Sequence, residues 1–224
     1  MEFSDPKIQL QIAYLLGGGM VMINFALLYQ SRMSSVINAF AIHATILGLA
    51  VAWQANIQDA PNLYITAGIA LVFKAGAIPA ALHYVVRKLN VHRTVEMVFG
   101  TGLTMMAGVG LVGLSVMIMH PVTQHSGALV TIDLIFAMAV VFLGVLMMIT
   151  RRNAVTQVIG FMAVENGLIL AAVGVHGMPL VVEISVALTV LVVFIVFGLF
   201  LFRIRERFYS LDVRYLDPDS RIPQ

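Results

Sequence analysis

Seven apolar segments, each about 20 residues long, recur along this chain of 224 residues. About 20 apolar residues in a helix cross the hydrocarbon core of a bilayer, and helices satisfy their own backbone hydrogen bonds there. The expected spans are 8–29, 34–54, 62–86, 95–119, 127–150, 154–175 and 179–203, with turns at Pro61, Pro121 and Pro179 between some of them. The sequence therefore predicts an all-α, polytopic membrane protein with about seven transmembrane helices.

The composition agrees with this fold class and excludes several functions. Hydrophobic residues make up 60% of the chain and charged residues only 11%. This leaves too little polar surface to cover a soluble globule of this length. The chain has no cysteine, which excludes disulfides, thiolate metal sites and iron–sulfur ligation by its own residues. The net charge of +2 is too small to indicate a nucleic-acid ligand. Any redox chemistry is therefore expected in a partner.

The basic residues indicate how the helices are oriented. Arginines follow the first, third, fifth and seventh predicted helices, whereas the loops on the opposite side contain only Lys7. The positive-inside rule then places the N-terminus outside and the C-terminus inside. The first residues, MEFSDPKIQLQ, are acidic and polar, so we expect no cleaved signal peptide and a retained first helix.

Two charged residues interrupt apolar segments, Lys74 in the third predicted helix and Glu165 in the sixth. The two helices enter from opposite sides, and a rise of about 1.5 Å per residue puts both side chains near the midplane. An unpaired charge there costs roughly 2.5 to 3.5 kcal/mol, so such residues usually pair or serve ion transfer. The pair could simply fix helix packing. Alternatively, it could relay a proton or its field, since a desolvated lysine readily gains and loses a proton.

Other polar residues extend this pair into a ladder of titratable groups. His43 is expected near mid-depth, either as a hydrogen-bonded neutral imidazole or as a proton relay. Asp133 and Glu183 are expected near the outer ends of the fifth and seventh helices, either as solvated helix ends or as part of an access channel. Pro79, five residues beyond Lys74, is expected to kink the third helix.

At these residues the chain resembles a known family. The segment RRNAVTQVIGFMAVENGLILAAVGVHGMPLVVEIS is similar to the C-terminal half of hydrogenase-4 component E, in which RN, GF or GY, ENG and P-L-V-E-I/L follow in this order. That family is a membrane subunit of formate hydrogenlyase and related group 4 nickel–iron hydrogenases. FKAGAIPAALHYVVRKLNV resembles the family's intramembrane lysine, proline and basic loop, and RFYSLDVRYL its closing segment. The resemblance covers nearly the whole chain.

The resemblance implies a place in a complex-I-like membrane arm. Glu165 would match the family's midmembrane carboxylate, Glu183 its carboxylate at the outer end of the last helix, and Lys74 its buried lysine. Relatives usually carry an aspartate six residues after the equivalent of Glu183, where this chain has Thr189. The implied partners are antiporter-like and subunit-H-like membrane subunits and a peripheral hydrogenase or dehydrogenase arm. A nickel–iron centre and iron–sulfur clusters are expected in those partners, and no cofactor or metal in this chain.

These expectations divide the chain into three regions: 1–126, a four-helix membrane region; 127–203, a three-helix region resembling subunit K of respiratory complex I; and 204–224, a cytoplasmic tail. The expected function is that of a noncatalytic subunit in a bacterial-type inner (cytoplasmic) membrane. It would contribute Glu165, Lys74, Glu183, His43 and Asp133 to a polar axis that couples redox chemistry to the movement of protons or sodium.

Alternative classes remain open. The chain could be a structural anchor that spaces larger subunits, or a subunit of a cation/proton antiporter or of a respiratory complex I-type NADH dehydrogenase. A heptahelical retinal protein is disfavoured, because the last predicted helix has no lysine for a Schiff base. A freestanding transporter is disfavoured, because the hydropathy pattern shows no internal repeat.

Overall fold

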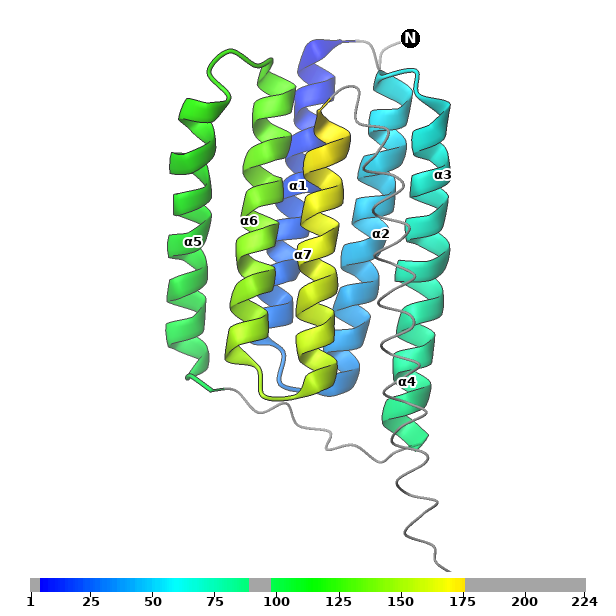
Figure 1. Ribbon diagram of the computed structural model, residues 1–224, viewed down its shortest axis with the longest axis vertical. Coiled ribbons are helices and arrows are strands. Elements are labelled where there is room, and N and C mark those ends of the chain that lie inside the picture. The colour runs from blue at the N-terminus through cyan, green and yellow to red at the C-terminus, as the bar shows by residue number, and fades with distance from the viewer. Residues whose placement is uncertain (1–4, 89–97, 176–224) are drawn as a thin grey trace, which may run out of the picture.

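The computed structural model describes residues 5–88 and 98–175, and helices make up most of both ranges (Figure 1). In chain order the elements are α1 (Pro6–Tyr29), α2 (Met33–Ile57), α3 (Pro61–Ile69), η2 (Ala70–Ala77), α4 (Ile78–Lys88), α5 (Thr101–Val122), α6 (Ala128–Thr150) and α7 (Ala154–Gly174). The elements α3, η2 and α4 follow one another directly and form one long helix, in which η2 is π-helical. The described residues contain no β-strand, as the all-α prediction requires.

Six helices in the described residues are long and apolar enough to cross a membrane, with the long helix from α3 to α4 counted once. The protein is therefore a multi-pass membrane protein, as predicted. The predicted spans 8–29, 34–54, 62–86, 127–150 and 154–175 each coincide with a helix to within a few residues. The predicted seventh helix, 179–203, and the tail, 204–224, lie outside the described residues.

The fourth predicted span, 95–119, has the wrong boundaries. The helix α5 begins at Thr101, because the residues before it form a bend and Gly100 takes an extended conformation at the N-cap. It also continues through Pro121 to Val122, so the turn begins at Thr123, two residues after the proline at which the sequence predicts it. A proline removes one backbone hydrogen bond, and in the last turn of a helix this loss does not stop the chain from continuing for one more residue.

Polar residues fix the ends of several helices. Asp5 accepts a hydrogen bond from the backbone N–H of Lys7 at 2.9 Å, and Pro6 occupies the first turn of α1. Asn153 caps α7 in the same way, accepting from the Val155 N–H at 2.9 Å. Such caps satisfy N–H groups that have no partner within the helix.

The helices form a layered bundle (Figure 1). Among the described helices, α6 packs against α1, α5 and α7, whereas α2 packs against α1, α7 and the long helix from α3 to α4. The helix α5 lies at one edge of the bundle, and the long helix lies at the other. The centre of the bundle is therefore formed by α1, α2, α6 and α7.

Glycines let α6 and α7 approach backbone to backbone. A Cβ atom at Gly144 of α6 would lie 2.8 Å from the Val164 backbone nitrogen and 3.0 Å from the Gly160 carbonyl oxygen. A Cβ atom at Gly167 of α7 would lie 3.0 Å from the Ala137 carbonyl oxygen. Small residues permit this close contact between helices in lipid. The contact fixes the rotation of α7, and with it the direction of the polar residues in its middle.

Two apolar clusters fill the centre of the bundle at different depths. One contains Phe40 of α2, Ile78 of α4 and Met162 of α7 among its members. The other contains Leu47 of α2, Ala70 of η2 and Ile169 of α7. In each of these three helices the sequence between the two clusters contains a buried polar residue. The fold therefore places polar side chains at one level, between two apolar layers.

Candidate functional site

A buried ion pair joins the long helix to α7. The Nζ atom of Lys74 lies 2.8 Å from Oε1 of Glu165, and the two side chains are only 1% and 2% exposed. Lys74 lies in η2 and Glu165 near the middle of α7, so the contact lies well inside the bundle. The two charges that the sequence puts at similar depth are thus in direct contact. Their opposite charges neutralise each other where water is excluded.

The backbone around Lys74 is π-helical. Proline has no N–H group, and its ring collides with the carbonyl group four residues earlier in an α-helix. Here the residue before Pro79, Ile78, donates its N–H to the Phe73 carbonyl oxygen five residues back. The disturbance that the sequence predicts at Pro79 therefore takes the form of the eight-residue segment η2. π-Helical segments are rare in proteins overall, and those that do occur are often found at functional sites.

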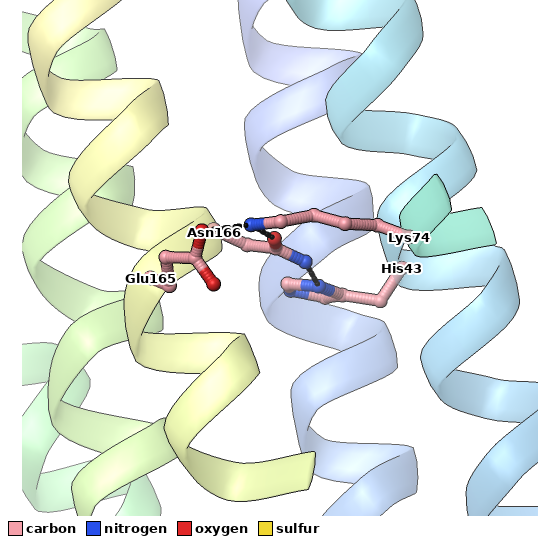
Figure 2. Close-up of polar contacts among 4 residues, drawn as sticks. All are labelled: His43, Lys74, Glu165 and Asn166. Atoms are coloured by element: carbon pink, nitrogen blue, oxygen red, sulfur yellow. Dashed lines mark hydrogen bonds and ion pairs between the residues drawn. The ribbon is translucent and has the colours of Figure 1, made fainter. Parts of the chain in front are cut away.

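Asn166 extends the ion pair toward α2 (Figure 2). The Lys74 ammonium group donates a hydrogen bond to Asn166 Oδ1 at 2.9 Å. On the other side of the amide, Asn166 Nδ2 lies 3.0 Å from His43 Nδ1. His43 and Asn166 are both 0% exposed. We call the four residues His43, Lys74, Glu165 and Asn166 the mid-span network.

A second buried polar group lies nearer one end of the bundle. Asp133 of α6 is 4% exposed, and its Oδ2 accepts a hydrogen bond from Gln54 Nε2 of α2. Gln58 Nε2 donates to Gln54 Oε1 at 3.1 Å and to the Val173 carbonyl oxygen of α7 at 2.7 Å. We call Gln54, Gln58, Asp133 and the Val173 carbonyl the end site. Asp133 is buried, so its interpretation as a solvated helix end is wrong.

The end site differs from the mid-span network in its charge. Among the described residues, no lysine, arginine or histidine forms an ion pair with Asp133. Its carboxylate is held by an amide, which supplies a hydrogen bond but no compensating charge. The described residues also contain no group of three His, Cys, Asp or Glu side chains placed to hold a metal ion.

Arg151, which the sequence marks only as a loop residue, is a structural cap. Its NH2 group donates to the carbonyl oxygens of Leu27, Leu28 and Gln30 at 2.9, 2.7 and 2.9 Å. Leu27 and Leu28 lie in the last turn of α1, whose final carbonyl groups have no partners within the helix, and Gln30 is the residue that follows its end. Burial lowers the pKa of the Arg151 guanidinium group. An arginine nevertheless remains charged in a protein, so Arg151 attaches α1 to the loop between α6 and α7.

The structure brings together three of the five predicted site residues, His43, Lys74 and Glu165. Asp133 lies apart from them in the end site. Glu183 and Thr189 lie outside the described residues.

Sequence reasoning missed the amides of both sites, Asn166, Gln54 and Gln58. A signal exists for Asn166 and Gln54, because each is a polar residue in an apolar helix, whereas Gln58 follows the end of α2 and carries no such signal. Gln54 also lies 11 residues after His43, about three helical turns, and so on the same face of α2.

Comparisons with known proteins assign no family. No family model matches the chain, and no solved structure matches it. A Mycobacterium tuberculosis protein described as the uncharacterized protein Rv0085 is 28% identical over 200 residues, which cover 88% of this chain and 90% of the relative. The similarity thus extends over nearly the full length of both proteins, and the description of the relative names no activity.

Proposed function

We propose that this protein is a noncatalytic membrane subunit of a complex-I-like hydrogenase or formate hydrogenlyase. It would lie in the bacterial cytoplasmic membrane with its N-terminus outside and its C-terminus inside. The mid-span network would contribute to the polar axis that couples redox chemistry in a peripheral arm to movement of protons or sodium. The proposal is supported by the motifs shared with hydrogenase-4 component E and by the geometry of the network.

The observation that carries the proposal is the ion pair between Lys74 and Glu165, 2.8 Å long and 1% and 2% exposed. Buried ion pairs lose much of their attraction to desolvation, and apolar residues of similar size often replace them without loss of stability. Stability alone is therefore a weak reason for the pair. Ionisable residues inside a membrane bundle commonly mark ion pathways.

The proposed mechanism is electrostatic. Two unit charges 2.8 Å apart attract by about 6 kcal/mol at an effective dielectric constant of about 20. Protonation of Glu165 would remove this attraction and leave the Lys74 charge without compensation from that carboxylate. The network would respond by losing a proton or by moving the ammonium group. Either response changes the field at neighbouring antiporter-like subunits, and no electron passes through this chain.

The test is Glu165→Gln in the complete complex. We expect the subunits to assemble and redox turnover to persist, while the number of ions moved per electron pair falls several-fold. The measurement is redox turnover alongside the pH gradient formed by the complex in liposomes. Asp5→Asn is the matched control, because it makes the same chemical change at an exposed helix cap. Unchanged coupling in Glu165→Gln would remove this carboxylate from the mechanism.

Membership of the complex is tested by copurification. After gentle detergent extraction from its native membrane, the chain should carry a nickel–iron hydrogenase with it, identified by mass spectrometry and metal content. A set of antiporter subunits without any redox protein would contradict the hydrogenase assignment and favour an antiporter.

A further inference from the structure

Asn166 is the link between two titratable side chains of the mid-span network. Its amide lies between Lys74 Nζ, 2.9 Å from Oδ1, and His43 Nδ1, 3.0 Å from Nδ2 (Figure 2). We propose that Asn166 is a positioning residue that makes protonation of Lys74 and protonation of His43 Nδ1 mutually exclusive. The inference rests on the proposed function for its biological role, but its geometry can be tested on the isolated protein.

The first step concerns donors and acceptors. An ammonium group can only donate hydrogen bonds, so the amide atom facing a charged Lys74 has to be the oxygen. The amide nitrogen then faces His43, and it can only donate. His43 Nδ1 therefore has to accept, which requires a neutral imidazole with its proton on Nε2. Hydrogen-bond partners of this kind are what determine the orientation of an amide and the tautomer of a histidine.

The second step is the opposite arrangement. If His43 carries a proton on Nδ1, this N–H and the amide NH2 are two donors facing each other. The conflict disappears when the amide rotates by about half a turn and presents its oxygen to His43. The amide nitrogen then faces Lys74, which can accept a hydrogen bond only as a neutral amine with a lone pair. The network has two consistent arrangements, and the orientation of Asn166 distinguishes them.

The protons balance between the two arrangements. In the first, Lys74 carries its proton, Glu165 is ionised, and the imidazole proton is on Nε2. In the second, the Nζ proton is on the Glu165 carboxyl group, and an N–H of the neutral amine donates to Oε1, 2.8 Å away, so that the single Nζ lone pair accepts from the Asn166 amide. The imidazole proton is then on Nδ1 and no longer on Nε2. Both contain the same number of protons, and no other bond changes. The protonation of Lys74 and Glu165 thus determines which ring nitrogen of His43, on α2, carries the imidazole proton.

Nothing else in the described residues holds the His43 tautomer. Its Nε2 atom is buried and has no hydrogen-bond partner among them. The buried titratable groups beside it are Lys74 from η2 and Glu165 from α7. The remaining titratable side chains on the helices packed against α2 do not face the His43 ring. His83 contacts the Pro79 carbonyl oxygen, and the others are exposed: Lys7, Tyr14, Tyr29, Tyr64, Tyr84 and Arg87. Among residues 5–88 and 98–175, Asn166 is therefore the side chain that contacts a ring nitrogen of His43 and sets its tautomer.

The experiment is nitrogen-15 NMR of the full-length protein in lipid bilayers with labelled histidine. The six histidines are separated by comparison with His43→Gln, which removes the signal of interest. In the unsubstituted protein we expect His43 Nδ1 to be unprotonated and Nε2 to carry the proton. Combining Lys74→Met with Glu165→Gln removes the ammonium donor and keeps the network neutral, so the Nδ1–H tautomer should rise at least several-fold. Asn166→Asp places an acceptor before Nδ1 and should make the Nδ1–H form predominant.

Asn24→Leu is the matched control, because Asn24 is also a buried asparagine and its amide contacts Val140 rather than the network. It should leave the tautomer of His43 unchanged. Nδ1–H in the unsubstituted protein would overturn the inference. So would an unchanged tautomer in both network variants, each checked for folding by size-exclusion chromatography. This readout needs no partner, so its failure is distinct from retained ion coupling in Glu165→Gln.

Discussion

The mid-span network and the end site bury charge in different ways, although α2 and α7 contribute to both. In the mid-span network an ammonium group and a carboxylate neutralise each other, and Asn166 adds hydrogen bonds. In the end site Asp133 meets the amide of Gln54. Deep inside the bundle a charge is paired with a counter-charge, whereas near the last turn of α2 the one contact of the Asp133 carboxyl group among the described residues is the Gln54 amide. We therefore expect the two sites to differ in how much stability is lost when the group that contacts the charged side chain is removed.

An apolar layer separates the two sites. On α2, Leu47 and Val51 lie between His43 and Gln54 on the same face, and both are 0% exposed. The distance along the helix axis is about 16 Å for 11 residues. No hydrogen bond in the described residues crosses this layer.

The largest effect is expected when one charge of the mid-span network is removed. Lys74→Met leaves the Glu165 carboxylate buried without its cation and should lower the free energy of unfolding by about 3 to 5 kcal/mol. Lys74→Met combined with Glu165→Leu should restore most of that loss, because no charge is left buried. The measurement is denaturant unfolding in detergent micelles for both single variants and the double variant.

The same double variant separates coupling from simple anchoring. If the pair only fixes helix packing, the stable double variant will retain ion coupling in the complete complex. Loss of coupling at normal stability supports the relay. A double variant as unstable as Lys74→Met would contradict the claim that the uncompensated charge causes the loss.

A smaller effect is expected in the end site, because no residue in the described part of the chain supplies a counter-charge that the loss of Asp133 would leave behind. Asp133→Leu removes the acceptor of the Gln54 amide and should cost about 1 to 3 kcal/mol. Asp133→Asn keeps the shape and an acceptor oxygen, so its cost should be less than about 1 kcal/mol. Thermal unfolding of the two variants side by side measures the difference. A cost for Asp133→Leu equal to that of Lys74→Met would show that both sites depend equally on charge.

Features of the fold and of the two sites could be predicted from the sequence where they depend on helix length or on depth in the membrane. Features that depend on how one helix is rotated against another could not. The thickness of the bilayer fixes helix length, so hydropathy placed most of the described helices correctly. Helical rise fixes depth, which is why Lys74 and Glu165 could be paired. The role of Asn166 depends on the rotation of α7, which is set by the glycine contacts with α6. Depth carries no information about rotation, so the amide was missed.

Two other features were predicted only in part. Arg151 was assigned to a loop by its charge, but its guanidinium group caps α1, 121 residues or more away in the chain. Pro79 indicated a disturbed helix, and the structure places the π-helical segment η2 directly before it, where Ile78 N–H donates to the Phe73 carbonyl oxygen. Sequence position alone does not determine these outcomes.

The smallest effect is expected at the contact between α7 and the end site. A Cβ atom at Gly174 would lie 2.9 Å from the Asp133 Cβ, so Gly174→Ala should displace this side chain at a cost of about 1 kcal/mol. Gly110→Ala is the matched control, because nothing described lies within 4 Å of that position. It should be neutral or slightly stabilising, since alanine favours helix more than glycine does. Equal thermal stability of the two variants would mean that α7 moves aside at this end, and that the end site is held less firmly than the mid-span network.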